Sequence, residues 1–175
     1  MISVRHIAGF LYYPARILAW LLSGTLIYSI IIFVFYAASN SMVLPLRIIN
    51  GRFELLFPFT QKIFLLGDYT PAYLLSNMIT FLFYACFLWL LSNVFYVFKQ
   101  VKLFTPTGVI QLSRFYITNL VFPFIFIGLL LAFGEEIMDV VQVIFLHLVI
   151  GVFAYFMAAI FKQGLLLQEE QDLTF

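Results

Sequence analysis

The sequence predicts an all-α membrane protein with four transmembrane helices and a small extracytoplasmic β-hairpin between the first and second helices. Hydrophobic residues make up 65% of the chain, charged residues 10%, and the mean hydropathy is +1.10, which excludes a soluble domain of this size. Four runs contain no Asp, Glu, Lys or Arg: 17–46, 69–98, 115–134 and 140–161. Each run reaches the roughly 20 residues that a helix needs to cross a hydrocarbon core of about 30 Å.

Each of these runs should form a helix, because a segment inside a bilayer must satisfy its own backbone N–H and C=O groups. We expect one domain over residues 1–175, with a loop at 38–71 and helices at about 16–37, 72–98, 109–133 and 138–166. Thr105 and Pro106 suit the N-cap and the first position of the third helix, which would then begin outside the membrane. Pro123 predicts a kink within its span.

The loop at 38–71 contains a hairpin signal. Asn50-Gly51 is the preferred pair for a two-residue type I′ turn, which predicts a hairpin over 44–57. The turn would pair Ile49 with Arg52, Ile48 with Phe53 and Arg47 with Glu54. A third strand is expected at 62–66, because an isolated hairpin is only marginally stable.

The distribution of Lys and Arg predicts the orientation, because cytoplasmic flanks retain positive charge. The N-terminus, the middle loop and the C-terminus hold six of these residues: Arg5, Arg16, Lys99, Lys102, Arg114 and Lys162. The hairpin loop holds Arg47, Arg52 and Lys62. Both termini should therefore be cytoplasmic. A net charge of +1 without a basic tract argues against direct binding to nucleic acid.

His147 is the residue that could titrate deep within a run, which makes it a candidate intramembrane site. In one hypothesis it belongs to a proton or metal relay and takes protons delivered through Glu135, Glu136 and Asp139 at the outer mouth. In the other, a neutral imidazole is hydrogen-bonded to a facing Ser, Thr, Asn or carbonyl group and joins two helices. The other amides of the spans, Asn77, Asn93, Asn119 and Gln142, lie close enough to run ends to be expected in hydrated positions.

Motifs for catalysis are absent from the sequence, which contains no H-E-x-x-H, G-x-S-x-G, P-loop or C-x-x-C pattern. We therefore expect no enzyme activity, no catalytic residues, no cofactor and no metal. Small residues recur at helical spacing in the last two spans, namely Gly128, Ala132, Gly151, Ala154 and Ala158. Such spacing favours close packing of helices.

The chain closes with the sequence FKQGLLLQEEQDLTF. It resembles the closing phrase of an uncharacterised bacterial membrane family, the domain of unknown function 2975, which has the form F-[RK]-x-G-x-x-L-[QR]-E-[ED]-x-[DE]-L-T-[VIF]. The matching positions are Phe161, Lys162, Gly164, Leu167, Gln168, Glu169, Glu170, Asp172, Leu173 and Thr174. A second family phrase, P-F-[ST]-x-E-N, is matched only in the Phe-Thr of residues 103–108.

The resemblance implies a four-span protein of the bacterial inner membrane, often encoded beside a small helix-turn-helix regulator, with no established activity. From it we form the hypothesis of a regulatory or sensor subunit that contacts such a cytoplasmic DNA-binding regulator. The candidate contact residues are Lys162, Gly164, Gln168, Glu169, Glu170, Asp172, Leu173 and Thr174. The alternative is a small transporter or ion-conducting homo-oligomer that uses His147, since one four-helix unit encloses little polar volume.

Overall fold

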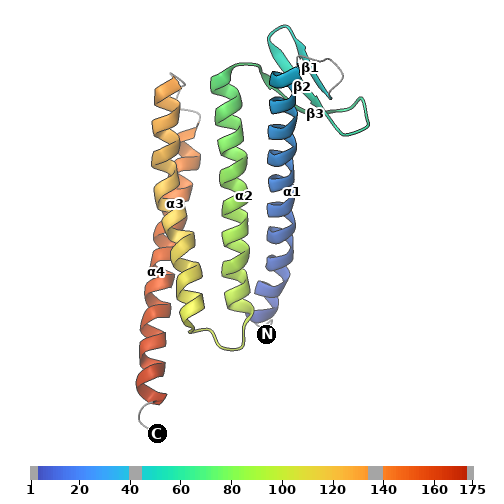
Figure 1. The fold of residues 1–175 in the computed structure, drawn as a ribbon. Coiled ribbons are helices and arrows are strands. Elements are labelled where there is room, and N and C mark those ends of the chain that lie inside the picture. Colours follow the sequence, from blue (N-terminus) through green and yellow to red (C-terminus); the bar gives the residue numbers. More distant parts are fainter. Residues whose placement is uncertain (1–3, 40–44, 134–139, 173–175) are drawn as a thin grey trace. The chain divides into compact units, whose positions relative to one another are not determined.

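The computed structural model describes residues 4–39, 45–133 and 140–172. In these residues the chain forms four long helices, α1 (Val4–Ser39), α2 (Pro71–Lys99), α3 (Pro106–Phe133) and α4 (Val141–Asp172). Between α1 and α2 lie three strands, β1 (Leu46–Ile49), β2 (Arg52–Leu56) and β3 (Ile63–Asp68) (Figure 1). The predicted fold class, four apolar helices with a small antiparallel sheet after the first, is confirmed.

All four helices are long and apolar enough to cross a membrane. In their most apolar 18-residue windows, only 11 to 22% of the residues are buried within the structure. Most of the apolar side chains therefore need a covering that the chain itself does not supply, and a bilayer supplies it. The chain is a multi-pass membrane protein.

Helix α1 begins at Val4, well before the expected start at residue 16, and contains Pro14. A proline inside a helix removes one backbone hydrogen bond and therefore disfavours the helix. Contacts with α2 favour the helix nonetheless: the Arg5 Nε donates to the Lys99 carbonyl oxygen at 3.0 Å, and the ring centroids of Tyr12 and Tyr96 lie 5.8 Å apart.

Helix α3 begins where the sequence indicated. Its first residue is Pro106, and the Gly108 N–H donates to the Thr105 Oγ1 at 3.0 Å, so Thr105 is the N-cap. The helix continues through Pro123 to Phe133, and the kink stays a prediction. Helix α4 continues to Asp172, beyond the expected end at 166, because a helix need not stop where its apolar run stops.

The sheet has the predicted hairpin register, with Ile49 opposite Arg52 and Arg47 opposite Glu54. Asn50 and Gly51 both have positive φ, 51° and 75°, as a type I′ turn requires. The third strand, β3, pairs antiparallel with β2. The facing charges of β1 and β2 form no ion pair; Arg47 instead donates to the Gln61 side chain, and Arg52 pairs with Asp68 at 3.1 Å.

The chain divides into two compact units. The sheet unit, Trp20–Ala85, has a core in which Phe53 and Leu55 of β2 pack with Leu46 of β1 and Ile32 of α1. The Tyr28 hydroxyl donates to the Leu56 carbonyl oxygen at 2.8 Å and ties α1 to the end of β2. These contacts supply the support that an isolated hairpin lacks.

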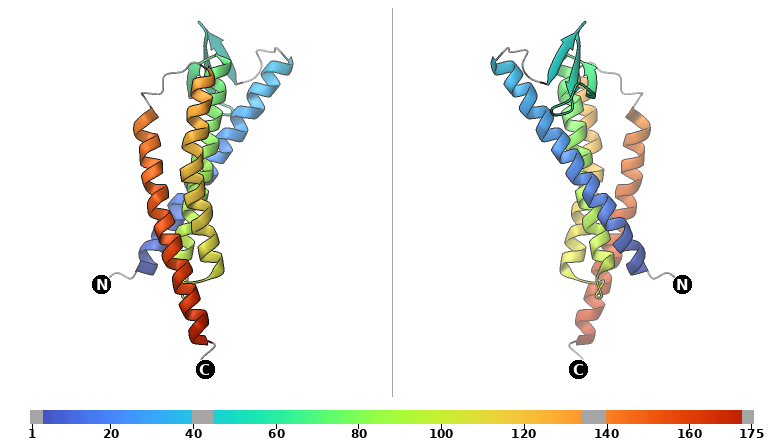
Figure 2. Two further views of the ribbon diagram at one scale, coloured as in Figure 1. Left: turned by 90° about the vertical axis from the view of Figure 1, so that its left-hand side faces the viewer. Right: turned by 90° about the vertical axis from the view of Figure 1, so that its right-hand side faces the viewer.

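The bundle unit comprises Met1–Ala19 and Cys86–Phe175. In it α3 and α4 lie side by side and antiparallel, as both views of Figure 2 show. Its buried core combines α2, α3 and α4 through Val94, Val97, Leu112, Phe115, Ala154, Ala158 and Phe161. The small residues on α4 therefore do what their spacing predicted, since Ala154 and Ala158 face the neighbouring helices.

Candidate functional site

A buried polar pair joins α3 to α4 inside the bundle unit. His147 is 4% exposed and Asn119 is fully buried, and the distance from His147 Nδ1 to Asn119 Oδ1 is 2.8 Å. The Asn119 Nδ2 donates to the Phe115 carbonyl oxygen one turn earlier, also at 2.8 Å. The amide oxygen must therefore be the acceptor from His147, so Nδ1 carries the proton in this bond.

The surroundings of His147 are apolar and closely packed. The Phe87 ring of α2 lies edge-on to the imidazole, with centroids 5.1 Å apart and planes at 87°. One turn along α4, a Cβ on Gly151 would lie 2.8 Å from the Leu120 side chain and 3.3 Å from the Asn119 Cβ. Gly151 therefore brings the two helices close enough for the His147–Asn119 bond to form.

This geometry agrees with the hypothesis that His147 joins two helices, and the facing group is the Asn119 side chain. The other members of the proposed relay, Glu135, Glu136 and Asp139, lie outside the described residues, so the relay stays a prediction. The expectation that Asn119 is hydrated near a span end is wrong. Four buried residues of α3 recur at spacings of three or four, namely Leu112, Phe115, Asn119 and Pro123, and this helical periodicity is the sequence signal that could have placed Asn119 on an inner face.

The candidate partner-binding residues lie on the last turns of α4 and beyond them. Lys162, Glu169 and Glu170 are exposed, Gln168 is half-buried, and Asp172 is the last residue of the helix. Leu173 and Thr174 lie outside the described residues. Gly164 packs within its own unit instead: a Cβ there would lie 2.6 Å from the Phe104 ring, which also contacts Phe161.

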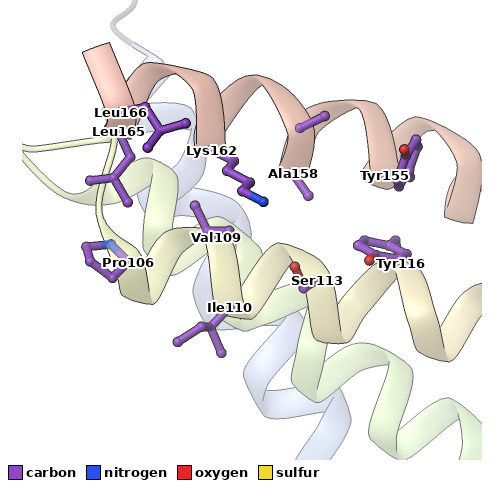
Figure 3. A pocket seen from close by; sticks show the side chains of 11 residues that line it. Pro106, Val109, Ile110, Ser113, Tyr116, Tyr155, Ala158, Lys162, Leu165 and Leu166 are labelled. Carbon is purple, nitrogen blue, oxygen red and sulfur yellow. The ribbon is translucent and has the colours of Figure 1, made fainter. Parts of the chain in front are cut away.

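Lys162 lies beside a groove of about 570 Å³ between α3 and α4. Figure 3 shows its ammonium group directed from α4 towards α3, with Ser113 and Tyr116 along the opposite wall. The remaining lining is mostly apolar and includes Val109 and Leu165. Lys162 therefore lines a groove, unlike the exposed residues Glu169 and Glu170 two helical turns later.

A second polar chain connects α1, α2 and α3. The Arg16 Nη2 donates to the Asn93 Oδ1 at 2.7 Å, and the Asn93 Nδ2 donates to the Gln111 Oε1 at 3.2 Å. The Arg16 guanidinium also lies over the Trp89 ring, 4.1 Å from its centroid. The sequence alone does not predict this set, because its members lie on three helices at large separations along the chain.

In the residues that the structure describes, no three His, Cys, Asp or Glu side chains are grouped as metal ligands. No model of a known protein family, no curated protein and no solved structure matches this chain. The assignment of function therefore depends on the geometry of these sites and on the closing sequence.

Proposed function

We propose that this chain is a non-enzymatic regulatory or sensor subunit of the bacterial inner membrane, and that it belongs to the family of unknown function 2975 that its closing phrase resembles. In this proposal both termini are cytoplasmic and the β1–β3 sheet is extracytoplasmic. The Lys and Arg distribution supports that orientation. The subunit would act by contacting a cytoplasmic protein through the end of α4.

One observation carries the proposal: α4 does not end where its charge-free run ends. The run stops at Phe161, whereas the helix continues to Asp172, which is about 16 Å further at 1.5 Å per residue. The extension exposes Leu166 and Leu167 together with Glu169 and Glu170. An apolar and acidic surface on a preformed helix can bind a partner at a lower cost in ordering than a flexible tail.

The direction of this extension is held by a contact within the bundle unit. The Phe104 ring, from the connection between α2 and α3, packs on Phe161 and Gly164 of α4. A movement of α4 would therefore displace Phe104 and the connection between α2 and α3, as well as the helical extension itself. Such coupling suits a protein that transmits a signal by contact.

The acidic end favours a basic partner. Glu169 and Glu170 would attract the DNA-facing surface of a small regulator and compete there with phosphate groups. Binding at the membrane would then keep the regulator from DNA, and release would free it. This is the simplest mechanism that uses the exposed carboxylates without requiring chemistry.

The test places a photo-crosslinking amino acid at Gln168 in the native host, with a matched probe at Gln61 as the control. We expect a small basic DNA-binding protein to be captured from Gln168 and not from Gln61. Reversing the charges with Glu169→Lys and Glu170→Lys should abolish capture, whereas Glu54→Lys on β2 should not. A partner that stays bound after deletion of residues 165–175 would refute the mechanism.

A further inference from the structure

The end of the bundle unit that holds Arg16 contains a polar cavity of about 480 Å³. Arg16 of α1, Asn93 of α2 and Gln111 of α3 line it, together with Thr107 of the first turn of α3. The two amides are joined to the guanidinium by the hydrogen bonds described above. The cavity is therefore built around one fixed cation.

Arg16 is held in place without being neutralised. Its guanidinium stacks on Trp89 and lies 5.5 Å from the Tyr12 ring centroid. Its hydrogen bond to Asn93 uses one of the five N–H donors that an arginine carries. Among the described residues it forms no ion pair, so a positive charge and several donors are available to a ligand.

The groups near Arg16 reinforce the positive potential. The Lys99 ammonium nitrogen lies 5.4 Å from the centroid of the Tyr12 ring, and the Arg5 Nε donates to the Lys99 carbonyl oxygen. The first turn of α3 contributes Thr107 to the lining, and the N-terminal end of a helix carries partial positive charge. The cavity is thus suited to an anion rather than to a cation or an apolar molecule.

The sequence places this cavity at the level of the membrane surface. Arg16 directly precedes the charge-free run 17–46, and Lys99 directly follows the run 69–98. Ile17, which follows Arg16 in the chain, and Tyr96, which lines the cavity, are exposed. An anion bound here would have its charge at the headgroup level and apolar protein surface below it.

We propose that this cavity binds the phosphate group of an anionic phospholipid. A phosphodiester carries one negative charge, which one guanidinium can balance, and its oxygens can accept from Arg16 and from the Gln111 amide. The acyl chains would lie along the apolar surfaces of the helices. This inference is independent of the partner proposed for the end of α4.

The experiment titrates the purified full-length protein in a non-ionic detergent with phosphatidylglycerol or phosphatidylcholine and counts bound lipids by native mass spectrometry. We expect one phosphatidylglycerol to bind with clear preference over phosphatidylcholine. Arg16→Gln should weaken that binding by about tenfold or more, because it removes a charge-assisted bond. The control Arg114→Gln, which removes an exposed cation outside the cavity, should leave it unchanged.

Two further measurements keep the proposal open to refutation. Gln111→Leu leaves the charge intact and should weaken lipid binding by a smaller factor, so it replaces Arg16→Gln if that variant does not fold. Inorganic phosphate should compete poorly with the lipid. Equal binding by both lipids, equal loss in the Arg114 control, or phosphate binding that depends on Arg16 and displaces the lipid would each overturn the assignment.

Discussion

At the scale of single residues, the His147–Asn119 bond is a buried polar link between α3 and α4. Both side chains are buried, and neither can exchange its partner for bulk water inside a bilayer. Hydrogen bonds between transmembrane helices are nevertheless worth only about 0.6 kcal/mol on average and up to about 1.7. The bond therefore aligns α3 and α4 more than it determines their stability.

A double-mutant cycle tests this bond. His147→Phe, Asn119→Leu and the double variant should each destabilise the protein, with a coupling energy of about 1 kcal/mol between the two positions. The measurement is reversible unfolding in mixed detergent micelles. Additive effects would show that the two side chains do not depend on one another.

The transport hypothesis for His147 leads to a separate experiment. If the imidazole serves only as a bridge, proteoliposomes containing the protein should show the same pH-dependent ion flux as protein-free vesicles. The flux is followed with a pH-sensitive dye inside the vesicles. A flux that is present in the wild type and lost in His147→Ala would place the protein among transporters.

The close approach at Gly151 gives a third prediction, with Gly128 as its control. Gly151→Ala puts a methyl group 2.8 Å from Leu120, which should cost about 1 kcal/mol after the gain in helix propensity is subtracted. Gly128→Ala meets nothing within 4 Å and should be neutral or slightly stabilising. The measurement is the free energy of unfolding of each variant. Equal changes in Gly151→Ala and Gly128→Ala would contradict the packing argument.

At the scale of elements, the sheet depends on its first turn. Gly51 has a φ of 75°, which a residue with a Cβ adopts at a cost of about 1 kcal/mol. Gly51→Ala should therefore loosen β1 and β2, seen as faster hydrogen exchange of their amides. Gly24→Ala, in open space on α1, should leave those rates unchanged, and unchanged rates in both variants would refute the role of the turn.

Local patterns predicted these elements well, because each depends on neighbouring residues. Asn50-Gly51 determined the hairpin register, and Thr105-Pro106 determined where α3 begins. Contacts between distant segments were not predictable from such patterns. The start of α1 before Pro14 follows from its packing against α2, and the bond of Arg47 to Gln61 follows from the path between β2 and β3.

In the candidate sites too, single residues could be predicted from the sequence, whereas the contacts between distant segments could not. His147 stood out because a titratable group inside a run is rare, and a facing Asn was among its expected partners. To predict that Asn119 is the partner of His147, one needs the register of α3 against α4, which no local pattern contains. The link from Arg16 to Asn93 and Gln111 required three helix ends to be brought together.

At the scale of the whole molecule, the orientation in the membrane is open to a direct test. The single cysteine, Cys86, is first replaced by Ala, and a cysteine is then introduced at Gln61 or at Gln168. A membrane-impermeant maleimide should label the Gln61 position in intact spheroplasts and the Gln168 position only after lysis. The reverse pattern would invert the proposed topology and remove the cytoplasmic role of α4.

The stacking of Arg16 on Trp89 also gives the protein a built-in optical reporter. The chain contains two tryptophans, Trp20 and Trp89, and the Trp89 ring lies under the guanidinium. Indole emission responds to nearby charge, so the fluorescence of Trp89 should change when an anion neutralises Arg16. In a Trp20→Phe background that signal would follow occupancy of the cavity in real time, in unlabelled protein and in an intact bilayer.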